Sequence, residues 1–197
     1  MSENHRLIHQ DSERVEWYTP AGIIEAARAA MGGIDLDPGS SAAANETVRA
    51  ACFFTEADDG LVRPWAGRVW LNPPVSANDR FIRHIVADYR AGRVTAACVM
   101  TFASLDTAWA RMLAAYPRWY PAGRVSYLRP DGSAGGAPPK ASMVTYLGTA
   151  VDRFVTEFTG RLGGWVDVPW EWHGRTVAEM TAAALGMNLY RRKETGS

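Results

Sequence analysis

Apolar residues recur at helical spacing in two stretches of the first half of the chain, and each stretch predicts a helix. The first covers residues 20–31. Thr19 is suited to its N-cap, Pro20 to its first turn, and the pair Gly32-Gly33 to its end. The second covers residues 79–89 and is followed by a glycine that can end it.

Short apolar runs bounded by turn residues predict strands between these helices. The runs are residues 34–37, 50–54, 68–71 and 94–100. A turn and a short helix through Arg49 are expected after the first run, and the helix over 79–89 separates the last two. This alternation of strands and helices is typical of a parallel sheet.

The second half of the chain predicts a different arrangement. A helix over 105–115, with its N-terminus near Ser104 or Asp106, is followed by strands over 124–128 and 143–147. These strands flank a loop rich in Gly, Pro and Ser, so we expect them to form an antiparallel pair. Beyond residue 150 the pattern is weaker, and a final helix is expected over 176–185. The whole pattern predicts an α/β fold, a three-layer sandwich on a mostly parallel sheet.

Length and composition fit one globular unit. The 197 residues, 47% of them hydrophobic, suffice for one sizeable core, so we expect a flexible leader over 1–15 and a single domain over 16–197. Cys52 and Cys98 lie in apolar runs and are expected to be buried thiols, with neither a disulfide framework nor a metal site. No apolar window is long enough to span a membrane, so a cytoplasmic protein is expected.

The charge balance bears on possible partners. Lys and Arg together number 21, as do Asp and Glu, so the formal net charge is zero. This balance argues against a surface that is basic throughout. Any contact with nucleic acid therefore has to be confined to one basic cleft.

Asn72-Pro73-Pro74 directly follows the third predicted strand. The exocyclic amine of a purine is a poor nucleophile because its lone pair is delocalised into the ring, so an enzyme that methylates it needs two acceptors for the N–H bonds. The side-chain oxygen of Asn72 and the backbone carbonyl of Pro73 are suited to this role, and the two prolines fix the backbone. Methyl transfer then requires positioning rather than a general base. A rigid turn is the alternative interpretation.

A second motif, Asp37-Pro38-Gly39, follows the first predicted strand. A parallel sheet brings such a turn to the same edge as Asn72-Pro73-Pro74. Asp37 is placed to receive the methionine ammonium of S-adenosylmethionine, and Gly39 lets this ligand approach the backbone closely. Asp35 is expected to lie next to Asp37 and farther from the cofactor. The alternative is an ordinary turn that begins at Asp37.

Three carboxylates, Glu56, Asp58 and Asp59, come after the second predicted strand. A carboxylate at a strand edge commonly accepts hydrogen bonds from the ribose or adenine of a nucleoside cofactor. Asp59 is the candidate for that role, with Glu56 as a competitor for the ribose hydroxyls. A surface turn over Asp58 and Asp59 explains these residues equally well.

Several short motifs in one order resemble the phage-type DNA N6-adenine methyltransferases. In chain order they are Glu16-Trp17-Tyr18-Thr19-Pro20, Ile34-Asp35-Leu36-Asp37-Pro38, Asn45, Asp59-Gly60-Leu61, Trp65, Trp70-Leu71-Asn72-Pro73-Pro74 and Gly123-Arg124-Val125. The resemblance covers residues 16–150. It implies a Rossmann-like methyltransferase sheet, S-adenosylmethionine as the methyl donor and adenine in DNA as the acceptor.

The resemblance also implies roles for individual residues. Asn72-Pro73-Pro74 corresponds to the catalytic loop, and Asn72 is also expected to contact the cofactor. The other expected cofactor-binding residues are Trp17, Tyr18, Thr19, Pro20, Asp35, Asp37, Pro38, Gly39 and Asp59. A phage-encoded enzyme of this type would work in the host cytoplasm, for example in restriction–modification.

One position departs from the family pattern. The family's catalytic loop ends in an aromatic residue that stacks on the flipped-out base, whereas Val75 stands there in this chain. Base–aromatic stacking is worth about 1–3 kcal/mol. The loss of this ring should weaken base capture unless another aromatic side chain, Phe81, Phe102 or Trp109, fills the place.

Extrusion of a base from the duplex costs a few kcal/mol, which contacts to the DNA have to offset. Basic side chains are expected to line the path of the DNA around the loop over 130–142. The candidates are Arg80, Arg83, Arg124, Arg129 and Lys140. Each of them also fits a solvated surface charge.

Two other functions fit the same sequence. Asn-Pro-Pro loops also serve the methylation of glutamine amides in proteins, and methylation of a protein partner without DNA binding would favour that activity. The other is a catalytically silent DNA-binding relative, in which Val75 marks a lost activity. Cofactor binding without turnover on any DNA would favour this second alternative.

Overall fold

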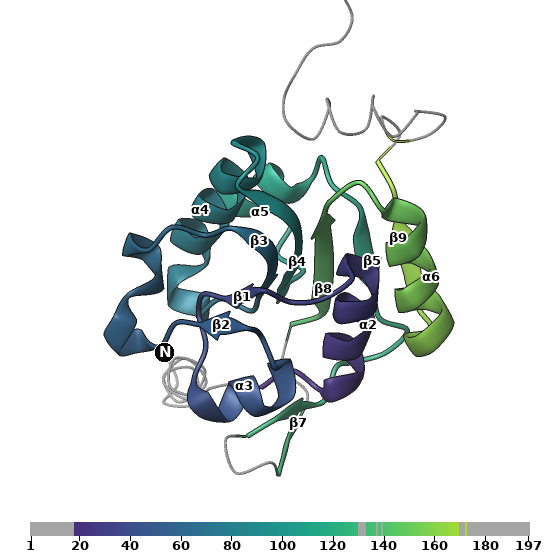
Figure 1. Ribbon diagram of the computed structural model, residues 1–197. Coiled ribbons are helices and arrows are strands. Elements are labelled where there is room, and N and C mark those ends of the chain that lie inside the picture. Colours follow the sequence, from purple (N-terminus) through teal and green to yellow (C-terminus); the bar gives the residue numbers. More distant parts are fainter. Residues whose placement is uncertain (1–17, 130–132, 137, 139, 170–171, 173–197) are drawn as a thin grey trace, which may run out of the picture.

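A seven-stranded sheet forms the centre of the protein. The computed structural model describes residues 18–129, 133–136, 138, 140–169 and 172 (Figure 1). The strand order is β2-β1-β3-β4-β8-β5-β9. The strands are β1 (Leu36–Asp37), β2 (Cys52–Phe53), β3 (Gly67–Leu71), β4 (Val94–Phe102), β5 (Arg118–Tyr120), β8 (Ser142–Leu147) and β9 (Trp165–Asp167).

The two halves of the sheet differ in direction. In the first half, β2, β1, β3 and β4 are parallel neighbours. In the second half, β8 is antiparallel to both β4 and β5, and β9 is antiparallel to β5. The carboxyl ends of β1, β2, β3 and β4 therefore lie at one edge of the sheet, as the sequence predicted for its first four strands.

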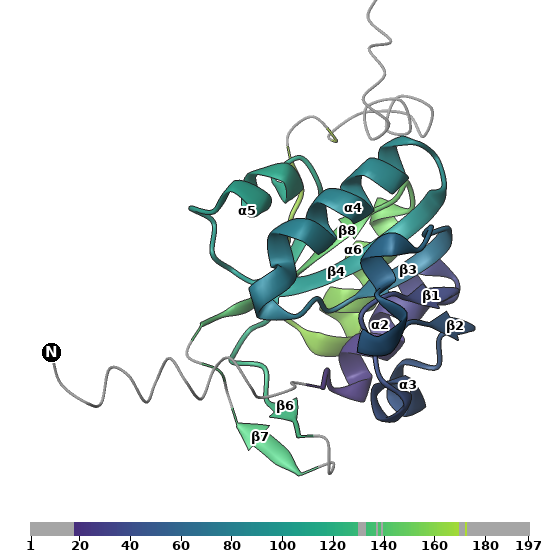
Figure 2. The same cartoon turned by 90° about the vertical axis from the view of Figure 1, so that its left-hand side faces the viewer.

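Helices cover both faces of this sheet. They are α2 (Ala21–Met31), α3 (Ala42–Val48), α4 (Asn78–Arg90), α5 (Ala108–Leu113) and α6 (Val151–Leu162). The pair α2 and α6 packs together on one face, and the pair α4 and α5 on the other (Figures 1 and 2). Three short 3₁₀ turns, η1 (Glu56–Asp58), η2 (Gly60–Val62) and η3 (Val75–Ala77), connect the elements of the parallel half.

Helix α6 is anchored by aromatic side chains that pack against one another. Phe154 lies 4.9 Å from Tyr146 of β8 and 4.6 Å from Phe158, measured between ring centroids. Phe158 in turn contacts Trp119 of β5, and all four side chains are buried. This helix was not among the elements predicted from the sequence, although its apolar residues recur at helical spacing: Val151, Phe154, Val155, Phe158 and Leu162.

The expected antiparallel pairing of residues 124–128 with 143–147 is wrong. A hairpin forms instead between β6 (Tyr127–Leu128) and β7 (Ala134–Gly136), which lies inside the segment expected to be a loop. Strand β8 pairs with β4 and β5. All six residues of β8 are buried, which suits a central position in the sheet rather than one strand of an exposed hairpin.

Some local predictions also need correction. Pro20 rather than Thr19 is the N-cap of α2, whereas Gly32 ends this helix in the left-handed conformation, as predicted. Helix α5 begins at Ala108, because the side chain of Thr107 caps it by accepting from the N–H of Ala110. Cys52 is exposed because β2 is an edge strand, while Cys98 is buried as expected.

Some predictions lie outside the described residues, namely the leader over 1–15, Trp17 and the final helix over 176–185. In the part of the chain that the structure describes, no helix is long and apolar enough to cross a lipid bilayer.

Candidate active site

The turn after β1 and the loop after β3 are in direct contact. Asp37 is the last residue of β1, and Asn72 follows the last residue of β3. A Cβ atom added to Gly39 would lie 3.7 Å from Cδ of Pro74 and 3.2 Å from Cε1 of Phe81 in α4. Gly39 therefore allows the Asp37-Pro38-Gly39 turn to pack against the Asn72-Pro73-Pro74 loop.

The side chain of Asn72 is held from the chain segment before α2. Its amide nitrogen donates to the hydroxyl of Thr19 at 3.3 Å, and this hydroxyl donates to the sulfur of Met100 in β4 at 3.7 Å. Thr19 is buried, Asn72 half-buried and Pro73 buried. The hydroxyl of Thr19 thus contacts the Asn72-Pro73-Pro74 loop and does not cap the helix.

Tyr18 joins the same region to two further elements. Its hydroxyl lies 2.9 Å from the hydroxyl of Ser41, which follows the Asp37-Pro38-Gly39 turn. Its backbone N–H and C=O both pair with Leu128 of β6, each at 2.9 Å. The segment over 18–20 therefore ties together the turn after β1, the Asn72 loop and the β6–β7 hairpin.

Asp37 is a buried carboxyl group. Its residue is 3% exposed, and the backbone N–H of Gly39 donates to Oδ1 at 3.4 Å. Burial raises the pKa of Asp37 from 3.8 to about 7, against the opposing effect of hydrogen bonds from Ser40 and Gly39. Among the described residues, Asp37 forms no ion pair. A buried carboxylate without a cation is costly, so the site fits a positively charged ligand.

Asp35 has a different environment. Its carboxylate accepts from Nε of Arg68 at 2.8 Å, from Nη2 of Arg68 at 2.6 Å and from the Arg68 backbone N–H at 2.8 Å. These hydrogen bonds lower the pKa of Asp35. Arg68 also donates to the carbonyl of Gly32, at the amino ends of β1 and β3. The structure thus places Asp35 with Arg68, two residues before Asp37.

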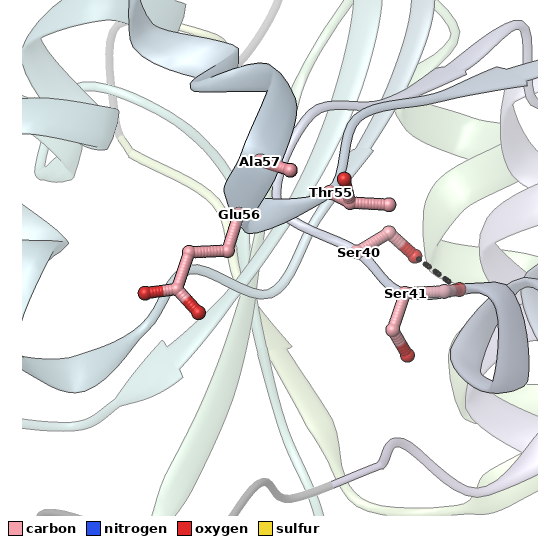
Figure 3. A pocket seen from close by; sticks show the side chains of 5 residues that line it. All are labelled: Ser40, Ser41, Thr55, Glu56 and Ala57. Carbon is pink, nitrogen blue, oxygen red and sulfur yellow. Dashed lines mark hydrogen bonds between the residues drawn. The ribbon is translucent and has the colours of Figure 1, made fainter.

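An open pocket of about 510 Å³ lies beside the turn after β1 (Figure 3). Its lining comes from the two turns that follow β1 and β2, namely Ser40, Ser41, Thr55, Glu56 and Ala57. The serine and threonine hydroxyls were not singled out from the sequence, although Ser41 also has a structural role as the N-cap of α3. The pocket offers hydroxyl groups and one carboxylate to a polar ligand.

Among the three carboxylates after β2, Glu56 lines this pocket. The carboxylate of Asp58 instead accepts from the backbone N–H and the hydroxyl of Thr55, at 2.8 and 2.7 Å, and these bonds lower its pKa. Asp59 is exposed and accepts from the N–H of Leu61 at 3.3 Å. Asp58 and Asp59 therefore act in the local turn structure.

The aromatic candidates near the Asn72-Pro73-Pro74 loop differ in exposure. Val75 is 53% exposed, whereas Phe81 is buried against Trp65 and Gly39. Trp109 is half-buried and packs against the hydrophobic core. Phe102 is half-buried at the carboxyl end of β4, two residues beyond Met100 and so on the same face of the sheet as the Met100–Thr19 contact.

The basic candidates come from two parts of the fold, helix α4 and the region of the β6–β7 hairpin. Arg80 and Arg83 lie on α4, where Arg83 pairs with Asp79. Arg124 donates to the carbonyl of Pro138 at 2.8 Å, and Arg129 lies in the β6–β7 hairpin. Lys140 is exposed shortly before β8. Within the described ranges, no group of His, Cys, Asp and Glu side chains is arranged to hold a metal ion.

The mixed sheet and the loops that meet at its carboxyl edge are consistent with the methyltransferase class. A family model described as DNA N-6-adenine-methyltransferase (Dam) matches residues 8–152, which is most of the chain. The protein belongs to this family, as its motifs predicted, and methylation of adenine in DNA is the activity of the class. None of the curated proteins matches the sequence.

Replacement of Asp37 by Asn tests the burial of this carboxyl group without any ligand. Because the folded pKa of about 7 exceeds the ordinary value of 3.8, folding takes up a proton between these values, and rising pH destabilises the wild-type protein there. Asp37→Asn carries no charge and escapes this loss. We expect it to melt at a higher temperature than wild type near pH 8, with a gap that shrinks as the pH falls through 7 toward 5.

Asp35→Asn provides the contrast in the same thermal-unfolding series. The pKa of Asp35 is lowered, so its stabilising effect is complete above the ordinary Asp pKa and is lost only as the pH falls through the lower folded value. This variant should be less stable than wild type throughout pH 5–8. A gap between Asp37→Asn and wild type that does not change with pH would contradict the account.

Proposed function

We propose that the protein transfers a methyl group from S-adenosylmethionine to the N6 amine of adenine in DNA. The observation that carries this proposal is the contact between the turn that bears the buried Asp37 and the Asn72-Pro73-Pro74 loop. It puts a group suited to a cationic cofactor next to a loop suited to an amine acceptor. Membership of the DNA N-6-adenine-methyltransferase family supports the same chemistry.

S-adenosylmethionine, when bound, would supply the methyl group: a bond from the amine nitrogen to the methyl carbon would form as the sulfonium S–C bond breaks, the neutral thioether would leave, and the amine would release one proton to solvent. In the proposal, Asp37 holds the ammonium of its methionine part, and the ion pair compensates the cost of the buried charge. The pocket lined by Ser40, Ser41 and Thr55 accommodates the nucleoside part. We assign the ribose hydroxyls to Glu56 rather than to Asp59, because Glu56 lines the pocket and Asp59 caps a turn.

On the acceptor side, Asn72 and Pro73 hold the adenine amine. The hydrogen bond from the Asn72 amide nitrogen to Thr19 orients the amide. In the proposal, the side-chain oxygen of Asn72 accepts one N–H of the adenine amine. The carbonyl of Pro73 accepts the other. Since Pro73 and Pro74 fix the backbone, both acceptors are preorganised, and positioning supplies most of the acceleration.

The base itself needs a stacking surface, because Val75 offers none. We assign this role to Phe102. Phe81 and Trp109 pack in or against the core, whereas Phe102 ends β4 at the edge that carries Asn72. The adenine is then flipped out of the duplex, and Arg80, Arg124 and Lys140 are assigned to the DNA backbone around it.

We also propose that the fold is a Rossmann-like three-layer sandwich. Four parallel strands, β2-β1-β3-β4, with a helix pair on each face of the sheet support it. In such sheets ligands bind outside the carboxyl ends of the strands. The pocket and the two motifs lie at that edge.

Asn72→Ala tests the proposed chemistry. Loss of one of the two acceptors should lower kcat by about 10²–10³ fold, whereas the Kd for S-adenosylmethionine should change little. The measurement is the transfer of tritiated methyl to unmethylated DNA, with mass spectrometry of the modified base and calorimetry of cofactor binding. Thr156→Ala, at an exposed position on α6, is the matched control.

Three outcomes separate the alternatives. Label in N6-methyladenine that disappears in Asn72→Ala supports the proposal. Label on glutamine side chains of a protein instead of DNA would support the protein methyltransferase. Cofactor binding by wild type without transfer to any DNA would support the silent relative.

Phe102→Ala tests the assignment of the stacking residue. Because stacking is worth about 1–3 kcal/mol per base, the KM for DNA should rise by about 5–150 fold, while the Kd for S-adenosylmethionine stays near the wild-type value. Phe102→Tyr should retain the wild-type KM. Addition of Val75→Phe to Phe102→Ala should restore part of the lost affinity, since it returns an aromatic ring to the loop. A wild-type KM in Phe102→Ala would refute this role.

A further inference from the structure

Trp65 lies between η2 and β3 and is fully buried. Its indole N–H donates to the carbonyl of Gly60 at 2.7 Å. Gly60 is packed so closely on the turn after β1 that an added Cβ would collide with the carbonyl oxygen of Pro38. The hydrogen bond from Trp65 therefore holds the Gly60 backbone in the position where it supports Pro38.

A second path leads from the same ring to Gly39. The ring of Trp65 lies 5.7 Å from that of Phe81, measured between centroids. Phe81 packs under Gly39, where an added Cβ would lie 3.2 Å from its ring. Trp65 thus supports both Pro38 and Gly39, the two residues that follow Asp37.

Helix α4, which carries Phe81, holds Trp65 at two further points. The carboxylate of Asp88 accepts from the Trp65 backbone N–H at 3.3 Å, and the His84 ring stacks on the indole with centroids 4.1 Å apart. Asp88 is buried and is itself bound by His84 and Arg93. Because α4 begins just after the catalytic loop, one rigid helix fixes both this loop and the support of the cofactor turn.

We infer that Trp65 is a positioning residue for the cofactor-binding turn, acting on Asp37-Pro38-Gly39 through Gly60 and Phe81. The inference rests on the proposed function, since it assumes that this turn binds S-adenosylmethionine. Trp65 touches no reacting atom in this account. Its loss should therefore change the affinity for the cofactor and leave the methyl-transfer step at saturating cofactor close to wild type.

Trp65→Phe removes the indole donor while it keeps an aromatic ring against His84 and Phe81. Trp119 offers a matched control, because it too is buried and donates its indole N–H to a backbone carbonyl, that of Gly163, at 2.8 Å. Trp119 lies on β5, in the antiparallel half of the sheet. Both substitutions leave one carbonyl without its donor, so comparable losses of thermal stability are expected.

The two variants should differ in cofactor binding. By calorimetry, Trp65→Phe should bind S-adenosylmethionine at least about fivefold more weakly than wild type, while Trp119→Phe binds it like wild type. In Trp65→Phe, kcat at saturating cofactor and the KM for DNA should stay within about twofold of wild type.

Equal Kd values for the two variants and the wild type would overturn the role of Trp65 while leaving the proposed function intact. Equally weaker binding of S-adenosylmethionine by both variants would mean that Trp65 acts only through the general stability of the protein. This result would also overturn the inference. Failure of the folded wild-type protein to bind S-adenosylmethionine would overturn the proposed function, and the inference with it.

Discussion

The site depends on how closely the backbone can approach at the carboxyl ends of β1 and β3. Gly39 packs on Pro74 and Phe81, and Gly60 packs on the carbonyl of Pro38, where a side chain would not fit. These two approaches bring the turn after β1, the turn after β2 and the loop after β3 into one cluster. The remaining contacts, from Thr19 to Asn72 and from Trp65 to Gly60, fix that cluster in place.

Burial of the charged Asp37 side chain costs folding free energy, and no ion pair among the described residues offsets it. Asp35 and Asp37 are two residues apart, yet Arg68 lowers the pKa of the first, whereas burial raises that of the second to about 7. Asp35 thus joins the amino ends of two strands, and Asp37 stays buried without a cation among the described residues. A group that destabilises the free protein and favours a positively charged ligand is typical of a binding site.

The sequence predicted the parallel half of the protein well, because its signals are local. Apolar runs that end in Asp37-Pro38-Gly39 or Asn72-Pro73-Pro74 mark both the strand and its carboxyl end. The position of β8 between β4 and β5 depends on long-range pairing, which no short motif encodes. Likewise, Glu56 lines the pocket, whereas Asp59 accepts a hydrogen bond within the local turn. This difference depends on the turn geometry and could not be predicted from the sequence. Helix α6 was missed although its spacing was visible.

The central claim is that Asp37 binds the cofactor and Asn72 binds the adenine amine, both at the same edge of the sheet. A crystal structure of the protein with S-adenosylmethionine tests it most directly. We expect the ammonium to lie within hydrogen-bond distance of the Asp37 carboxylate, about 2.7–3.2 Å. The nucleoside part should lie beside Ser40 and Glu56, and the methyl group should point toward Asn72. A cofactor bound elsewhere, or with its ammonium turned away from Asp37, would contradict it.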